Sequence, residues 1–198
     1  MSRKRIFIVF GVAFLIFLLN DFCYCEKSQA EERKYTKEFG IFSGWISGEL
    51  RRQKDYNLIP LYLQFGFNVN SFFEKINIKT KGDFKFIYEP FLNTVVSPDA
   101  NIETGINFII KYSYPLTQRF NFYLEAGLGG LYYTQHTYEQ GTQFNFSEQG
   151  GGGVSFFLTK NKVLSLGYRF RHFSNADIKA PNKGIDSEEI LCGISFLY

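Results

Sequence analysis

Residues 59–68 read IPLYLQFGFN, and in this stretch a purely apolar set of side chains alternates with a more polar set. A period of two is typical of a β-strand whose two faces meet different surroundings. From Phe39 onward no window sustains the 3.6-residue apolar period of a helix. One face of this stretch carries Ile59, Leu61, Leu63, Phe65 and Phe67, and the other carries Pro60, Tyr62, Gln64, Gly66 and Asn68. The segment therefore predicts a two-faced strand.

The same alternation recurs along the rest of the chain and predicts eight strands in all. Besides 59–68, they lie near Phe39 to Leu50, Phe84 to Asn93, Ile102 to Tyr112, Phe120 to Leu128, Thr142 to Leu158, Lys162 to Asn175 and Ile185 to Tyr198. Eight strands make the smallest common closed barrel. The final strand also ends on an aromatic residue, Tyr198, as bacterial outer-membrane proteins do in their assembly signal.

Charged side chains occupy the face with the smaller residues, which requires a polar interior. A soluble sandwich would instead turn its aromatic face inward. The connections at Pro115–Leu116 and Lys160–Asn161 look tight, while those at 51–56, 94–101, 133–141 and 176–184 look longer, as in an outer-membrane barrel; 71–81 is an exception. We predict an all-β, eight-stranded antiparallel transmembrane barrel of the bacterial outer membrane. The inward charges are Lys85, Glu89, Glu103, Lys111, Glu125, Arg169 and Arg171.

The N-terminus has the order of a secretory signal. Three basic residues, 3–5, precede an uncharged run from Ile6 to Leu19, which is short for a spanning helix of roughly 20 residues. Cleavage after Cys25 or after Ala30 fits the sequence, so we assign 1–30 to the signal and 31–198 to one barrel domain. Either cut leaves Cys192 as the lone cysteine, which excludes an intramolecular disulfide.

Composition narrows the classes of function. The 198 residues carry 22 Lys plus Arg against 19 Asp plus Glu, a net charge of +3, so a nucleic-acid partner is not predicted. The 45% hydrophobic content excludes intrinsic disorder. The glycine run 150–153 lacks the Lys-Ser/Thr of a phosphate-binding loop, and neither histidine has partners typical of a metal site. We therefore expect no cofactor and no metal.

Polar residues interrupt the apolar face of the last two strands. Carrying the parity of Leu164 to Phe170 forward brings His172 and Ser174 onto the outer side, and the last strand brings Asp186 and Glu188 there. A symmetric hairpin about Ala180 would put Ser174 opposite Asp186 and Glu188 opposite His172. A serine, a histidine and a carboxylate are the components of a nucleophilic triad. On this face, the triad would reach only lipid.

The segment GYRFRHFSNADIKAPNKGID, from Gly167 to Asp186, together with the closing GISFLY, resembles the lipid A 3-O-deacylase family of the PagL type, outer-membrane esterases related to acyloxyacyl hydrolases. The resemblance rests on a His-x-Ser-Asn-Ala core followed by Pro-Asn-x-Gly and an acid. It implies that Ser174 is the nucleophile, His172 the general base and acid, and Asp186 the residue that orients His172. It further implies that Asn175 and Asn182 help to form the oxyanion hole. The best-known members carry Glu at the position of Asp186, which leaves Glu188 as a rival.

The expected function is that of an outer-membrane esterase that removes the ester-linked 3-O-acyl chain of lipid A. Its partner would be lipopolysaccharide, and a periplasmic N-terminus would put the site near the external face. The alternative is a small structural or adhesive barrel without enzymatic activity. The sequence does not decide between a monomer and a homodimer.

Overall fold

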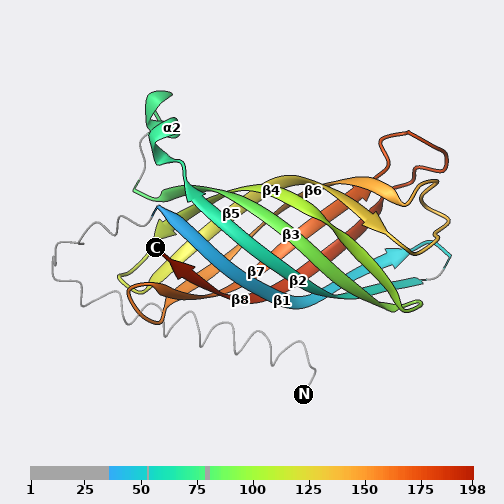
Figure 1. Ribbon diagram of the computed structural model, residues 1–198, viewed down its shortest axis with the longest axis horizontal. Helices are drawn as coiled ribbons and strands as arrows, with labels where there is room; N and C mark the ends of the chain where they lie inside the picture. Colours follow the sequence, from blue (N-terminus) through green and yellow to red (C-terminus); the bar gives the residue numbers. More distant parts are fainter. Residues whose placement is uncertain (1–35, 53, 79–80) are drawn as a thin grey trace, which may run out of the picture. The chain divides into compact units, whose positions relative to one another are not determined.

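The computed structural model describes residues 36–52, 54–78 and 81–198, which form a closed antiparallel barrel in which each strand pairs with its neighbour in sequence and β8 returns to β1 (Figure 1). The expected signal segment lies outside the described residues. Among the described residues, no helix has the length and hydropathy to cross a bilayer. The strands are β1 Lys37–Leu50, β2 Lys54–Asn68, β3 Asp83–Ser97, β4 Asn101–Pro115, β5 Phe120–Tyr133, β6 Phe144–Phe157, β7 Lys162–Ser174 and β8 Ile185–Leu197.

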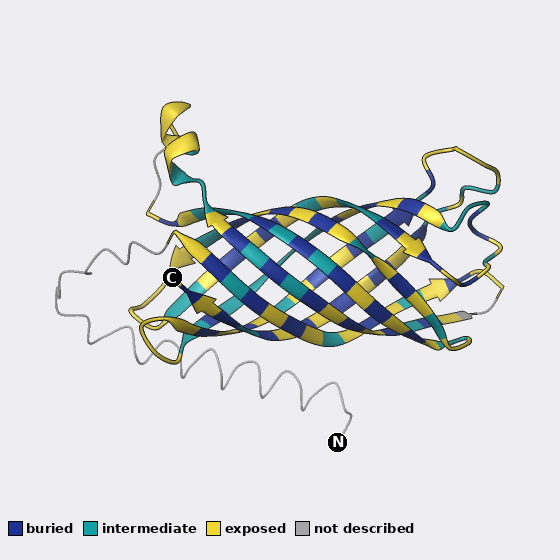
Figure 2. Cartoon of the chain, in the orientation of Figure 1, coloured by how far each residue is buried: buried dark blue, intermediate teal, exposed yellow. Residues whose placement is uncertain are grey.

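The barrel wall alternates between buried and exposed residues along most of its length, which confirms the predicted two-faced pattern; the glycine-rich stretch 150–154 of β6, of intermediate burial throughout, is an exception (Figure 2). In β2, Tyr62 and Gln64 are buried in the lumen, whereas Leu61 is 44% exposed on the outer wall. The outer wall of β7 carries Leu166 and Phe170, also exposed. The apolar face therefore covers the outside of the barrel, as a membrane-spanning barrel requires.

Ion pairs in the lumen satisfy the predicted inward charges except Lys111, whose ammonium lies over the ring of Tyr123. Arg169 donates to both carboxylate oxygens of Glu89, at 2.8 and 3.2 Å, and through Nε to Glu125 at 3.0 Å. Arg171 pairs with Glu103 in the same bidentate way. Bidentate guanidinium–carboxylate pairs are among the strongest protein hydrogen bonds. These pairs join β7 to β3, β4 and β5, none of which is its neighbour in the sheet.

The strands extend further than the sequence predicted, so two expected loops are short. The connections after β1 and β3 cover only 51–53 and 98–100, because the polar stretches 54–58 and 94–97 continue the sheet. The connections after β5 and β7 are longer, as predicted. The exceptional segment after β2 contains the short helix α2, Asn70–Lys75, which projects from the other end of the barrel (Figure 1).

Aromatic packing anchors β7 at the end that carries the long loops. Phe173 is fully buried and points into the lumen, where its ring contacts the rings of Tyr56 and Tyr133 at centroid distances of 6.4 and 5.7 Å. Its neighbours in the chain, His172 and Ser174, therefore face outward. The buried ring fixes the strand on which the candidate nucleophile and base lie.

Candidate active site

His172 and Asp186 form a hydrogen-bonded pair on the outer wall. Nδ1 of His172 lies 2.6 Å from Oδ1 of Asp186, and the two side chains are 34% and 68% exposed. An ionised carboxylate only accepts hydrogen bonds, so Nδ1 carries the proton in the neutral ring and Nε2 is left as the base. The pair thus presents a basic nitrogen toward the surroundings of the barrel.

The register of β7 and β8 differs by two residues from the symmetric hairpin expected from the sequence. His172 lies directly opposite Asp186, and Phe170 lies opposite Glu188. The return loop is not symmetric about Ala180, because Ala176 and Asp177 adopt positive φ directly after β7 and Ile178 N–H donates to the Asn175 carbonyl. Glu188 lies instead beside the Tyr168 hydroxyl. The register gives His172 one adjacent carboxylate on β8, Asp186.

Ser174 is the last residue of β7, two positions after His172 and on the same face. Its backbone pairs with Phe146 of β6. No hydrogen bond joins its hydroxyl to His172 within the described residues. Successive residues on one face of a strand lie about 6.6–6.8 Å apart. A change of side-chain rotamer therefore decides whether the hydroxyl reaches the imidazole.

Asn175 and Asn182 hold the loop that follows Ser174. The Asn175 amide donates to the carbonyls of Lys179 and Pro181, at 2.7 and 3.1 Å, and its backbone N–H donates to Asn182 Oδ1 at 2.9 Å. These bonds occupy both amide hydrogens of the fully buried Asn175, so its amide has no hydrogen left for a substrate. Asn182 gives one amide hydrogen to Asp177 at 2.9 Å and keeps the other.

Gly184 lies against the ring of His172. Its φ of 68° lies in the left-handed region, which residues other than glycine adopt only with strain. A Cβ at this position would overlap Cε1 of His172 and lie 2.9 Å from Nε2. Only glycine therefore lets the loop pass this close to the basic nitrogen.

The β5–β6 loop braces the loop 175–184. Glu139 is buried and accepts a hydrogen bond from the backbone N–H of Arg51 at 2.7 Å, while its own carbonyl accepts from Lys183. The ring of Tyr138 lies between the cationic groups of Arg52 and Lys183, at 3.7 and 4.0 Å. A hydrogen bond from Lys183, together with the two positive charges, lowers the pKa of Tyr138. Three connections are thus joined above the site.

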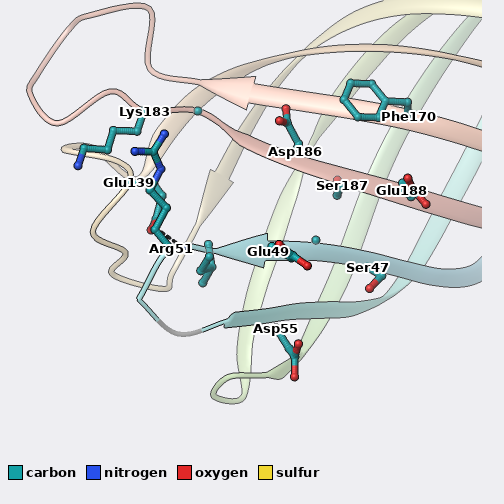
Figure 3. Close-up of a pocket in the computed structure, with 13 residues that line it drawn as sticks. Ser47, Glu49, Arg51, Asp55, Glu139, Phe170, Lys183, Asp186, Ser187 and Glu188 are labelled. Atoms are coloured by element: carbon teal, nitrogen blue, oxygen red, sulfur yellow. Dashed lines mark hydrogen bonds between the residues drawn. The ribbon is translucent and has the colours of Figure 1, made fainter.

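The wall differs on the two sides of the His172–Asp186 pair. Toward β1 and β2, a groove of about 870 Å³ is lined by polar side chains, including Asp186, Glu188 and Glu49, with Lys183 and Arg51 at its end (Figure 3). Toward β6 and β5, the exposed side chains around Ser174 are mostly apolar: Phe144, Phe146 and Leu128, the last 66% exposed. The wall is therefore polar on one side of the pair and mostly apolar on the other.

One carboxylate near the site was missed in the sequence. Glu148 is exposed on the outer wall of β6 and lies opposite His172. The sequence did carry a signal for it, because Glu148 alternates in step with Phe144 and Phe146 and so falls on the same outward face of the strand. Among the described residues, no group of three or more His, Cys, Asp or Glu side chains is arranged to hold a metal ion.

A family model described as lipid A 3-O-deacylase (PagL) matches residues 47–195. The chain belongs to this family. A curated PagL-family relative, the lipid A deacylase PagL of Bordetella bronchiseptica, is 40% identical over 68 residues, which cover 33% of this chain and 36% of the relative. The match thus spans about a third of that relative's length.

Two solved structures have a similar barrel fold. The crystal structure of the outer membrane enzyme PagL has a TM-score of 0.60 at 17% identity and covers 78% of this chain and 97% of its own. The crystal structure of Neisserial surface protein A has a TM-score of 0.61 at 16% identity and covers 82% and 97%. At these identities the structures establish the barrel alone. Family and fold together support an outer-membrane location.

Proposed function

We propose that this protein is an outer-membrane esterase that hydrolyses the ester-linked 3-O-acyl chain of lipid A. The observation that carries the proposal is the 2.6 Å contact between His172 Nδ1 and Asp186 on the outer wall. His172 lies two residues before Ser174 on the same face of β7. A purely structural barrel gives no reason for a basic imidazole held by a carboxylate beside an outward serine. The membership in the lipid A 3-O-deacylase family supplies the substrate.

In the proposed mechanism, Ser174 Oγ attacks the carbonyl carbon of the acyl ester while Nε2 of His172 takes the hydroxyl proton. Collapse of the tetrahedral intermediate breaks the bond to the sugar oxygen, which receives that proton. A water molecule then attacks the acyl-enzyme carbonyl while Nε2 of His172 takes its proton. The bond to Ser174 Oγ breaks, Oγ receives that proton, and the fatty acid is released. Asp186 keeps the proton on Nδ1 and stabilises the imidazolium. The open Ser174–His172 distance is compatible with this role, because such hydrogen bonds often tighten only when substrate binds.

We propose that the remaining amide hydrogen of Asn182 donates a hydrogen bond to the negatively charged oxygen of the tetrahedral intermediate. A donor aimed at a developing oxyanion contributes about 10²- to 10³-fold in rate. Asn175, expected from the resemblance to share this role, is instead proposed to brace the loop, since its donors are already used. We place the site at the external face, where lipid A lies, and the acyl chain over β5 and β6.

Mass spectrometry of lipid A tests the proposal. Cells whose lipid A carries a 3-O-acyl chain would express either the native chain or Ser174→Ala at equal outer-membrane abundance. We expect the native chain alone to remove one hydroxyacyl mass. Identical spectra from two folded barrels would refute the esterase and favour the structural or adhesive barrel.

A further inference from the structure

The segment between β2 and β3 carries apolar side chains that the described residues leave uncovered. Phe72, on the short helix α2, is 60% exposed, and Ile76 and Ile78, which follow it closely, are 52% and 42% exposed. None of the residues of α2 is buried. Exposed apolar clusters of this kind mark a surface for a partner or for a membrane. The cluster therefore points to an apolar surrounding outside the barrel.

Hydrogen bonds hold the base of this segment in a fixed direction. The side chain of Asn70 accepts a hydrogen bond from the backbone N–H of Phe84 at 2.6 Å and donates one to Asp83 at 2.9 Å. The backbone N–H of Ile78 donates to the Phe73 carbonyl at 2.9 Å, which turns the chain back beside α2. Figure 1 shows α2 standing out sideways from the wall rather than along the barrel axis. A segment held in this direction meets the surface of the bilayer in which the barrel stands.

An aromatic stack joins α2 to the outer wall of the barrel. The rings of Phe73 and Phe84 stack at a centroid distance of 3.9 Å, and Phe84 in turn contacts Tyr112 of β4 at 4.7 Å. Phe84 and Tyr112 pair across β3 and β4 on the outward face, in step with the exposed Ile110. Aromatic residues line both interfaces of a transmembrane barrel. The exposed side chains of α2 thus continue the surface that faces lipid.

Basic side chains flank the apolar cluster. Lys75 lies in the last turn of α2 and Lys81 shortly before β3, and both are exposed. Within the part of the chain that the structure describes, neither makes an ion pair. Of the two acids in the segment, Glu74 and Asp83, the second is already bound by Asn70. Apolar and aromatic residues beside lysines are typical of segments that lie in the plane of an anionic bilayer surface.

We propose that α2 and the turn after it, residues 70–78, bind phospholipid at the bilayer surface, at the end of the barrel opposite the active site. Phe72, Ile76 and Ile78 enter the acyl layer near the headgroups, and Lys75 and Lys81 bind the phosphates of anionic phospholipids. The proposed function puts the active site at the external face, so this end faces the periplasm. The binding itself does not depend on that function.

Depth-dependent fluorescence quenching in vesicles tests the proposal. Trp45, the single tryptophan of the chain, would be replaced by Phe, and Phe72→Trp introduced in that background. The full barrel would be reconstituted into phosphatidylcholine vesicles with a minor fraction of phosphatidylglycerol brominated near the top of its acyl chain, or of phosphatidylcholine brominated in the same way. Asp99→Trp is the water-exposed control, because Asp99 lies exposed in the connection after β3. Heat-modifiable electrophoretic mobility would verify that each variant is folded.

We expect both lipids to quench Phe72→Trp, with the anionic lipid enriched about fivefold around it, the effect of one lysine near an anionic surface. Lys75→Glu should bring this enrichment near one. Lys160→Glu, the same charge change in the β6–β7 turn at the same end, should keep it.

Quenching of Phe72→Trp no stronger than that of Asp99→Trp would overturn the inference and favour a soluble partner for α2. The absence of anionic enrichment, or an enrichment that Lys75→Glu leaves unchanged, would overturn it as well. Ester hydrolysis is measured separately on the same vesicles. An inactive barrel with the expected quenching would overturn the proposed function and keep this inference.

Discussion

The lumen and the outer wall of this barrel both carry charged side chains, but their surroundings differ. In the lumen, Arg169 and Arg171 are about 1% exposed and each holds carboxylates from other strands. On the outer wall, the His172–Asp186 pair is largely exposed and leaves Nε2 of His172 as a base. Lumen charges therefore serve the stability of the barrel, and outer-wall charges near Ser174 are available for chemistry.

The largest expected effect comes from His172→Gln, which removes the base from the outer wall. General acid–base catalysis contributes up to about 10⁴-fold, so we expect a fall of about that size in kcat/KM. The urea unfolding midpoint should stay unchanged, because His172 is partly exposed and makes no contact with the lumen. An ester hydrolysis assay beside urea titration measures both. A lower urea midpoint in His172→Gln would show instead that His172, like the lumen charges, stabilises the barrel.

Arg169→Met tests the other half of the comparison. Removing one partner of a buried ion pair leaves Glu89 and Glu125 uncompensated, which costs about 3–5 kcal/mol of unfolding free energy. Ester hydrolysis per folded molecule should remain near native, because Arg169 faces the lumen whereas His172 and Ser174 lie on the outer wall of β7. Tryptophan fluorescence of Trp45 during urea unfolding gives the stability. An activity loss without a stability loss would contradict the division between lumen and wall.

Period-two alternation made the strands and their inward and outward faces predictable, since each strand of a barrel has one polar and one apolar side. The strand ends were not, because segments such as 54–58 join the sheet through backbone pairing that polar side chains do not reveal. The register at the site depends on the left-handed turn at Ala176 and Asp177, which no short-range pattern near Ala180 indicates. Glu148 was missed because its place opposite His172 depends on the register of β6 with β7.

Asp186→Asn and Glu188→Gln separate the two candidate acids. Asp186 accepts the hydrogen bond from the protonated Nδ1 of His172, so its amide variant should lower kcat/KM about 10²-fold. The loss should be smaller than in a buried triad because the carboxylate is exposed. Glu188 lies opposite Phe170, so its variant should stay within about twofold of the native chain. A larger loss in Glu188→Gln than in Asp186→Asn would reverse the assignment. Steady-state kinetics on one ester is sufficient.

Gly184→Ala sharpens the comparison within the outer wall itself, because it changes no charge. Its Cβ would push against the His172 ring, and a displacement of about 1 Å in a catalytic group can cost about 10²-fold; we expect a loss of about 10- to 100-fold. The strained φ should cost about 1–3 kcal/mol of stability. Gly150→Ala is the control, since a Cβ there meets only a carbonyl oxygen at 3.8 Å and φ is not positive. Equal activities in the two variants would show that the approach of the loop to His172 is not what positions the base.

The smallest expected effect is that of a chelator. If a histidine held by a carboxylate performs the proton transfer, ester hydrolysis in excess EDTA should stay within about twofold of the untreated rate, since His172 and Asp186 supply the proton transfer themselves. The assay needs purified protein in detergent, because EDTA also disrupts lipopolysaccharide packing in cells. A loss restored by Ca²⁺ would instead show that a metal ion takes part in the reaction, and His172→Gln would then cost far less than predicted above.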